Sequence, residues 1–197
     1  MRRCLGQRLR GIDMKFLSLP AVFVSALLLS GCMASTGGGI YRDRVDPVTG
    51  ERTLQTTGVT FLTADQGIFS GLDTGVGLGG KIINGVPYFV IGYSGNNWLF
   101  LQRAEIRLEG SSAIYTLDMN DPTREVGSTA RVYENQTIRA DRGDARSLLE
   151  EIIRKSKLPK SSKIYIRAEG QDSFVSGVGT LKSGPKSFGA FFADRIQ

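Results

Sequence analysis

The segment from Trp98 to Glu109 limits the fold of this 197-residue chain more than any other, because its apolar and charged side chains alternate. Apolar residues recur at even positions, and charged residues occupy the odd positions from Arg103 onward. Successive side chains of a β-strand point to opposite faces, so a period of two predicts a strand with one buried and one solvated face. The apolar set is Trp98, Phe100, Ala104, Ile106 and Leu108, and the charged set is Arg103, Glu105, Arg107 and Glu109.

Several other segments are rich in aromatic and β-branched residues, which is typical of strands. Turn residues at 94–97 and 110–111 separate some of them and predict sequential hairpins. The chain contains 25 glycines, and glycine favours turns over helices. The further predicted strands are 59–63, 88–93, 113–119, 129–138, 163–169 and 173–178.

Two segments have apolar residues at helical spacing. The first begins at a predicted N-cap, Asp144, and its apolar stripe consists of Leu148, Leu149, Ile152 and Ile153. The second covers 185–196, with Phe188, Phe191, Phe192 and Ile196 on one face. Strands outnumber helices, so we predict an α+β fold: an antiparallel β-sheet or sandwich with about two helices packed on one side.

Residues 14–32 have the features of a secretory signal. Lys15 supplies the positive start, and 16–29 form an apolar run of 14 residues, shorter than the roughly 20 that a membrane-spanning helix needs. The residues at the cleavage point, Leu29-Ser30-Gly31-Cys32, resemble the lipobox of bacterial lipoproteins. The alternative is an ordinary secretion signal with a cysteine there by chance.

The resemblance implies that the leader is removed before Cys32 and that Cys32 carries acyl chains of the palmitate type. Met33 follows Cys32, where an aspartate would signal retention in the inner membrane. By resemblance, the mature protein is therefore expected on the periplasmic side of the outer membrane. We therefore expect a signal peptide over 1–31, with translation starting at Met14, a lipidated cysteine and flexible tether over 32–56, and one globular domain over 57–197. The sequence after the lipobox resembles no family.

Charge and residue types argue against several functions. Five basic residues and one acidic residue precede Cys32, leaving 20 basic and 18 acidic residues in the mature chain. That balance lacks the strong basic field of a nucleic-acid-binding protein. The chain has no histidine, and its two cysteines, Cys4 and Cys32, belong to the leader region. We therefore expect no thiol or histidine catalysis, no metal site and no cofactor.

Two short motifs have structural alternatives. Gly75 to Lys81 (GVGLGGK) matches glycine-rich phosphate-binding patterns, but those require a strand before and a helix after. Ile82 stands where a phosphate loop has Ser or Thr, so we predict a glycine-rich loop or wide turn. Residues 183–186 match S-x-x-K, the motif that places a lysine near the nucleophilic serine of serine acyltransferases. Here the motif is predicted to be a turn that leads into the last helix, which argues against catalysis.

Candidate ligand-binding residues are Trp98, Tyr88 and Tyr93, which could line an apolar cavity. For Trp98 the alternative is an anchor in the core or at the sheet edge. Paired carboxylates could serve a hydrolase if they met across a cleft, although on alternating strand positions they are more simply a solvated face. The carboxylates considered are Glu105, Glu109, Glu134, Asp141 and Asp144.

Together these observations favour a membrane-anchored, non-catalytic binding or scaffold module in the periplasm. Its partners would be the membrane, through the lipid, and an envelope protein or glycan, through a charged sheet face that includes Arg103, Glu105 and Arg107. The alternatives are a carrier of a small apolar ligand and a cell-wall or ester hydrolase.

Overall fold

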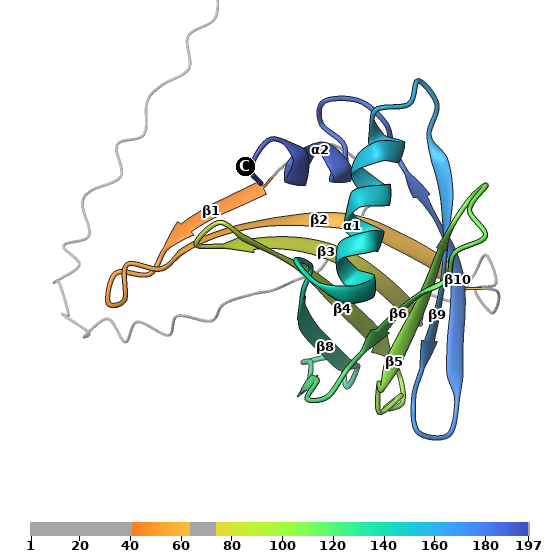
Figure 1. The fold of residues 1–197 in the computed structure, drawn as a ribbon. Helices are drawn as coiled ribbons and strands as arrows, with labels where there is room; N and C mark the ends of the chain where they lie inside the picture. Colours follow the sequence, from red (N-terminus) through yellow and green to blue (C-terminus); the bar gives the residue numbers. More distant parts are fainter. Residues whose placement is uncertain (1–40, 64–73, 197) are drawn as a thin grey trace, which may run out of the picture. The chain divides into compact units, whose positions relative to one another are not determined.

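The computed structural model describes residues 41–63 and 74–196 (Figure 1). By its contacts the chain divides into two units, Met1–Cys32 and Met33–Gln197, and all the described residues belong to the second. The leader and Cys32 lie outside the described residues, so the signal peptide and the lipid anchor stay predictions. Neither helix in the described part of the chain has the length and apolarity to cross a bilayer.

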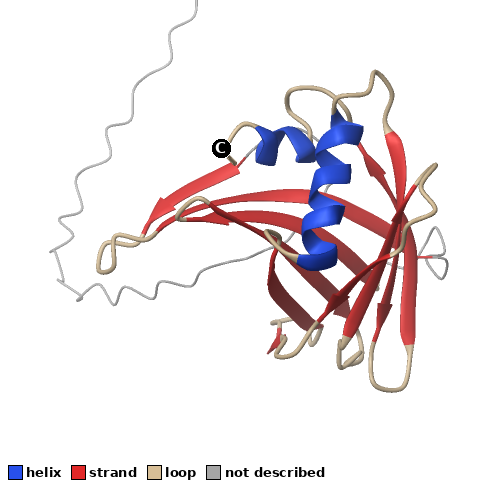
Figure 2. Ribbon diagram, in the orientation of Figure 1, coloured by secondary structure: helices blue, strands red, loops and turns tan. Residues whose placement is uncertain are grey.

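The described residues form ten strands and two short helices (Figure 2). In chain order these are β1 (Tyr41–Val45), β2 (Arg52–Thr63), β3 (Gly75–Ile83), β4 (Val86–Gly95), β5 (Arg103–Leu108), β6 (Tyr115–Asp118), β7 (Thr123–Val126), β8 (Val132–Arg139), α1 (Gly143–Ser156), β9 (Ser162–Glu169), β10 (Phe174–Leu181) and α2 (Phe188–Ala193).

All strand pairings are antiparallel, and the spatial order is β6-β5-β9-β10-β2-β3-β4-β8-β7, with β1 paired to β2 outside this order. β10 meets β2 through two residue pairs, Gly177 with Thr63 and Val178 with Leu62. That short junction divides the strands into a curled six-stranded half-barrel and a four-stranded sheet. The predicted antiparallel fold is therefore confirmed.

The two helices pack against each other and against the same side of the strands (Figure 2). Leu148, Leu149 and Ile152 of α1 are buried, as are Phe188 and the two phenylalanines after it in α2. Their burial joins both helices to one hydrophobic core. The predicted apolar faces of both helices are confirmed, apart from Ile153 and Ile196, which are partly buried.

Glycines under α2 allow that helix to approach the sheet closely. A Cβ at Gly80 would lie 2.8 Å from Cζ of Phe192 and 2.9 Å from Cε2 of Phe188. A Cβ at Gly58 would lie 2.7 Å from Cε2 of Phe188. The phenylalanine rings therefore rest on sheet backbone, and the Phe192 ring stacks edge-on against Phe89 of β4 with centroids 5.8 Å apart.

The glycine-rich segment at 75–81 corrects a prediction. We expected a loop or wide turn, but the segment lies in strand β3. Val76, Leu78 and Ile82 are buried at alternate positions, so a strand pattern was present and the glycines between them concealed it. The strand leads into another strand through a turn, and no helix follows it, so a phosphate-binding loop is also excluded.

The predicted tether over 32–56 is wrong where the structure describes it. Residues 41–45 and 52–63 form the β1–β2 hairpin, whose turn lies at 46–50. Asp46 holds that turn, because its Oδ1 accepts hydrogen bonds from the backbone N–H groups of Val48 and Thr49 at 2.8 and 2.9 Å. The turn was predicted; residues 42–45 of β1 are exposed and mostly polar, and β2 begins with polar residues, so this stretch resembled a linker.

Two element boundaries also differ from the prediction. Helix α1 begins after Arg142, which makes no side-chain cap, and the predicted cap Asp144 lies in the first turn. Oδ2 of Asp144 accepts a hydrogen bond from the backbone N–H of Thr116 at 3.0 Å and so links α1 to β6. The alternating segment that begins at Trp98 becomes a strand only at Arg103.

Candidate binding surface

Residues 96–102, here called the aromatic loop, connect β4 to β5. Leu99 and Leu101 are buried, whereas Trp98 is half-buried and Phe100 is 43% exposed. Phe100 has a φ of 54°, in the left-handed region that bulky residues rarely adopt. In the loop the odd-numbered leucines are therefore buried and Phe100 is exposed, opposite to the prediction, whereas Trp98 packs partly buried against the core.

A buried carboxylate on β8 explains this conformation. Glu134 is fully buried, and its Oε1 accepts the backbone N–H groups of Leu99 at 2.6 Å and Phe100 at 2.9 Å. Its Oε2 accepts the N–H of Leu101 at 2.8 Å. Consecutive amides of a strand point in opposite directions, so three can meet one anion only where the backbone leaves the strand conformation. The left-handed Phe100 lies at the centre of that bend.

Arg124 of β7 completes the surface. Its Nε lies 3.4 Å from Oε2 of Glu134, which gives the buried anion a cationic partner. Its guanidinium carbon lies 5.4 Å from the ring centroid of Phe100, a cation–π distance. The Trp98 and Phe100 rings are 6.5 Å apart and tilted by 40°. One carboxylate thus fixes the backbone of the loop that carries the exposed Phe100 ring and the partly buried Trp98 ring, and it also pairs with the arginine beside Phe100.

The structure separates the three predicted ligand-binding residues. Tyr93 is buried, and its hydroxyl donates a hydrogen bond to the backbone carbonyl of Asn97 at 3.0 Å. Burial, followed by the nearby charge of Glu134, raises the pKa of the Tyr93 phenol. Tyr93 therefore supports the loop that carries Trp98. Tyr88 belongs to the opposite face of β4, so the three do not line one cavity.

Sequence reasoning missed Phe100 and Arg124 as surface residues and considered Glu134 only as a possible catalytic group. A signal for Glu134 does exist in β8. Val132 and Glu134 are buried two positions apart on the same face of the strand. A charged group on the buried face of a strand needs hydrogen-bond partners. The partners of Glu134 are backbone N–H groups 33–35 residues earlier in the chain.

The charged face predicted on β5 is confirmed as a solvated face. Arg103, Glu105 and Arg107 alternate with fully buried residues and lie on the outer side of the four-stranded sheet. Arg103 pairs with Glu169 of β9, and the guanidinium carbon of Arg107 lies 5.0 Å from the ring centroid of Tyr165. These contacts within the sheet hold the face in a fixed arrangement.

A second buried carboxylate, Glu151, lies on α1. It accepts hydrogen bonds from the hydroxyls of Tyr115 and Ser111 and pairs with Arg154, whose Nη2 lies 3.0 Å from Oε1. Burial and the hydrogen bond to Glu151 raise the pKa of Tyr115 to about 12. Glu151 thus links α1 to β6 and the loop before it.

The other carboxylates considered for a hydrolase are tied to structural partners. Asp141 pairs with Arg139, which lowers the pKa of Asp141, and Oε2 of Glu109 accepts the backbone N–H of Lys163 at 2.9 Å. Glu105 is on the charged face described above. Ser183 and Lys186 lie in the connection between β10 and α2.

Comparison with known proteins gave no match: no protein-family model fits the sequence, and neither a curated protein nor a solved structure is significantly similar to it.

Proposed function

We propose that this chain is a lipid-anchored envelope protein whose β-domain is a non-catalytic binding module, and that the aromatic loop makes the contact with its partner. The observation that carries the proposal is the left-handed Phe100, whose backbone N–H is bonded to the buried Glu134 and whose ring is exposed. A left-handed conformation costs roughly 1–2 kcal/mol for a residue with a side chain. A loop needed only to turn the chain would have glycine at this position.

The chemistry of the surface supports binding. Trp98, Phe100 and Arg124 combine aromatic rings with a guanidinium, and tryptophan and arginine are enriched among the residues that dominate binding energy. Because Glu134 fixes the loop in advance, little conformational freedom is lost when a partner docks. An envelope protein or glycan remains the proposed partner, with the charged face on β5 as a second contact area.

Binding is favoured over catalysis by the way the buried acids are used. Among the described residues two carboxylates are buried, Glu134 and Glu151, and each accepts several hydrogen bonds from the protein itself. A general acid or base must instead exchange its proton with a substrate. The carrier alternative is weakened because Tyr88 and Tyr93 belong to opposite faces of β4.

The test compares photocrosslinked products of the full chain in intact envelopes with those of a double variant, Trp98→Ala with Phe100→Ala. We expect the crosslinked product to fall by about tenfold or more, because the anchoring rings are lost. Leu158→Ala is the matched control, since Leu158 is an apolar residue with the same 43% exposure as Phe100 and belongs to neither of the two proposed contact areas. Equal yields from the wild type and the double variant would refute the role of the loop.

The anchor is tested separately with Cys32→Ser. The lipobox resemblance predicts that this variant leaves the membrane fraction, because acyl chains supply the membrane affinity. Its aromatic loop should still bind a glycan partner, which co-sedimentation with isolated cell-wall material measures. A variant that stays in the membrane fraction contradicts the anchor and leaves the loop's role intact.

A further inference from the structure

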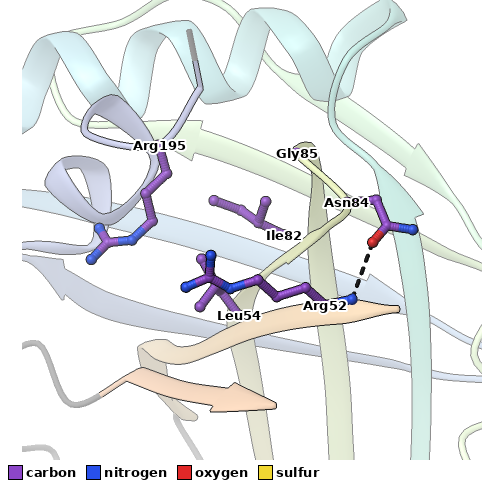
Figure 3. Close-up of a pocket in the computed structure, with 6 residues that line it drawn as sticks. All are labelled: Arg52, Leu54, Ile82, Asn84, Gly85 and Arg195. Carbon is purple, nitrogen blue, oxygen red and sulfur yellow. Dashed lines mark hydrogen bonds between the residues drawn. The ribbon is translucent and has the colours of Figure 1, made fainter. Parts of the chain in front are cut away.

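A pocket of about 320 Å³, drawn in Figure 3, has no lining residue in common with the aromatic loop. It is formed by the start of β2, the end of β3 with its turn, and the residues after α2. Its volume is near the lower limit for small-molecule sites. The lining residues are Arg52, Leu54, Ile82, Asn84, Gly85 and Arg195.

The floor of the pocket is apolar. Leu54 and Ile82 are directly paired across β2 and β3, so their side chains share one face of the sheet. Ile82 is 3% exposed and Leu54 is partly buried against the core. An alkyl chain lying on this pair would remove apolar surface from water, which is favourable by roughly 25 cal/mol per Å².

Two guanidinium groups border this floor. Arg52 is two residues before Leu54 on the same face of β2, and Arg195 follows α2; Figure 3 shows both side chains beside the space above Leu54 and Ile82. Each guanidinium presents five N–H donors and suits carboxylate or phosphate oxygens. Two guanidinium groups beside an apolar floor match the chemistry of an anion attached to an alkyl chain.

Intramolecular contacts orient both arginines. Nη2 of Arg52 lies 2.7 Å from Oδ2 of Asp43, and hydrogen bonding to Arg52 lowers the pKa of Asp43. Nη1 of Arg195 donates to the carbonyl of Phe191 at 3.1 Å, and its guanidinium carbon lies 5.2 Å from the Phe191 ring centroid. Nε of Arg52 also donates to Oδ1 of Asp43 at 3.2 Å, so the carboxylate of Asp43 is bonded to Arg52 by two hydrogen bonds.

The turn between β3 and β4 fixes the rim. Asn84 and Gly85 both have left-handed backbones, with φ of 47° and 84°. Oδ1 of Asn84 accepts the backbone N–H of Arg52 at 3.1 Å, and the N–H of Asn84 donates to the carbonyl of Arg52 at 3.1 Å. This pair of bonds fixes the backbone of Arg52 against the rim, so the pocket has a defined shape.

We propose that this pocket binds the acidic end of an anionic amphiphile, a carboxylate or phosphate on an alkyl chain. The anion contacts Arg52 and Arg195, and the first methylene groups lie on Leu54 and Ile82. A free fatty acid or alkyl phosphate and the headgroup of an anionic membrane lipid share this chemistry. The site is independent of the aromatic loop and of the proposed anchor.

The experiment uses the full chain carrying Cys32→Ser, so that its own acyl chains cannot occupy the pocket. Calorimetry compares decyl phosphate, below its micellar concentration, with inorganic phosphate and with uncharged decyl maltoside. We expect one site for decyl phosphate, with at least about tenfold weaker binding of both other compounds, because each lacks half of the recognition. Equal affinity for inorganic phosphate or for decyl maltoside overturns the proposal.

Substitutions then locate the site. Arg52→Gln and Arg195→Gln should each weaken decyl phosphate binding by about tenfold, the loss expected for a charge-assisted contact. Arg44→Gln is the matched control: it removes the same charge from the same hairpin, but Arg44 is next to Asp43 and so lies on the opposite face of β1. Equal losses in all three variants indicate attraction by net charge alone and overturn the site.

The two sources are separated with vesicles. Binding of monomeric decyl phosphate that depends on both arginines supports a free amphiphile. Arginine-dependent binding to phosphatidylglycerol vesicles, with none to phosphatidylcholine vesicles and none to the monomer, supports a lipid headgroup. Absence of arginine-dependent binding in both arms overturns the proposal.

Discussion

Glu134 and Glu151 are both buried carboxylates, yet they bond to different kinds of group. Glu134 accepts three consecutive backbone N–H groups and has Arg124 as its cation. Glu151 is bonded by side chains alone among the contacts described, from Tyr115, Ser111 and Arg154. The first carboxylate therefore sets a backbone conformation, and the second ties a helix to its neighbours.

This difference determines how much stability the protein loses when each carboxylate is removed. The backbone amides bonded to Glu134 belong to the aromatic loop itself, and they depend on the carboxylate for hydrogen bonds. The partners of Glu151 are partly exposed or long enough to turn toward water. A buried glutamate thus fixes the aromatic loop at Glu134, whereas the buried glutamate at 151 only ties helix α1 to its neighbours.

The largest effect is expected from Glu134→Ala. This change leaves three amides and Arg124 without their acceptor, so we expect the free energy of unfolding to fall by about 3–5 kcal/mol. Urea denaturation followed by circular dichroism measures the change. Arg146→Ala, which removes an exposed ion pair with Glu150, is the control and should cost less than about 1 kcal/mol. A loss below about 1 kcal/mol for Glu134→Ala would show that the loop does not depend on the carboxylate.

Glu151→Ala should have a smaller effect, about 1–2 kcal/mol, because water can replace the acceptor for Tyr115 and Ser111. The same denaturation experiment measures it. Crosslinking through the aromatic loop should be unchanged in this variant. If Glu151→Ala proved as costly as Glu134→Ala, the distinction between backbone and side-chain partners would have no energetic meaning.

Phe100 offers a comparison at a single position. Glycine is normally less stable than alanine within an ordered segment, but at a φ of 54° it escapes the steric cost that alanine retains. We expect Phe100→Gly to be more stable than Phe100→Ala by about 1 kcal/mol, as measured by thermal unfolding. Both variants should lose crosslinking equally. Alanine as the more stable variant would indicate that Phe100 is not left-handed in solution.

An effect confined to high pH concerns the titration of Tyr115. Its pKa is about 12 in the folded protein, against a reference value of 10.0. Between these values the folded state retains a proton that the unfolded state releases, so stability falls as the pH rises from 10 to 12. Absorbance at 295 nm should show one late-titrating tyrosine, which Tyr115→Phe removes. A titration of Tyr115 near pH 10 would contradict the buried contact with Glu151.

Local patterns predicted much of this fold. The strand at 163–169 has Ile164, Ile166 and Ala168 buried, as its alternation required, and it pairs with the following strand. The phenylalanines of α2 were predicted from their spacing alone. Each of these elements has its signal within a few residues of sequence, and the antiparallel arrangement follows from their short connections.

The errors arose where distant residues decide the structure. Gly80 of β3 and Gly58 of β2 make room for the Phe188 and Phe192 rings of α2, more than 100 residues later in the chain. The aromatic loop departs from the strand pattern because its backbone N–H groups donate hydrogen bonds to Glu134. Strand β7 has no buried position to give a periodic signal. No window of sequence contains both partners of such contacts.

Trp98 is the chain's single tryptophan, and it lies in the aromatic loop beside Phe100. All tryptophan emission from the native protein therefore originates in the segment proposed to bind. A shift in emission wavelength, or a change in quenching by iodide, would report events at this loop without any attached label. The protein thus contains an optical probe at the position where its partner is expected to dock.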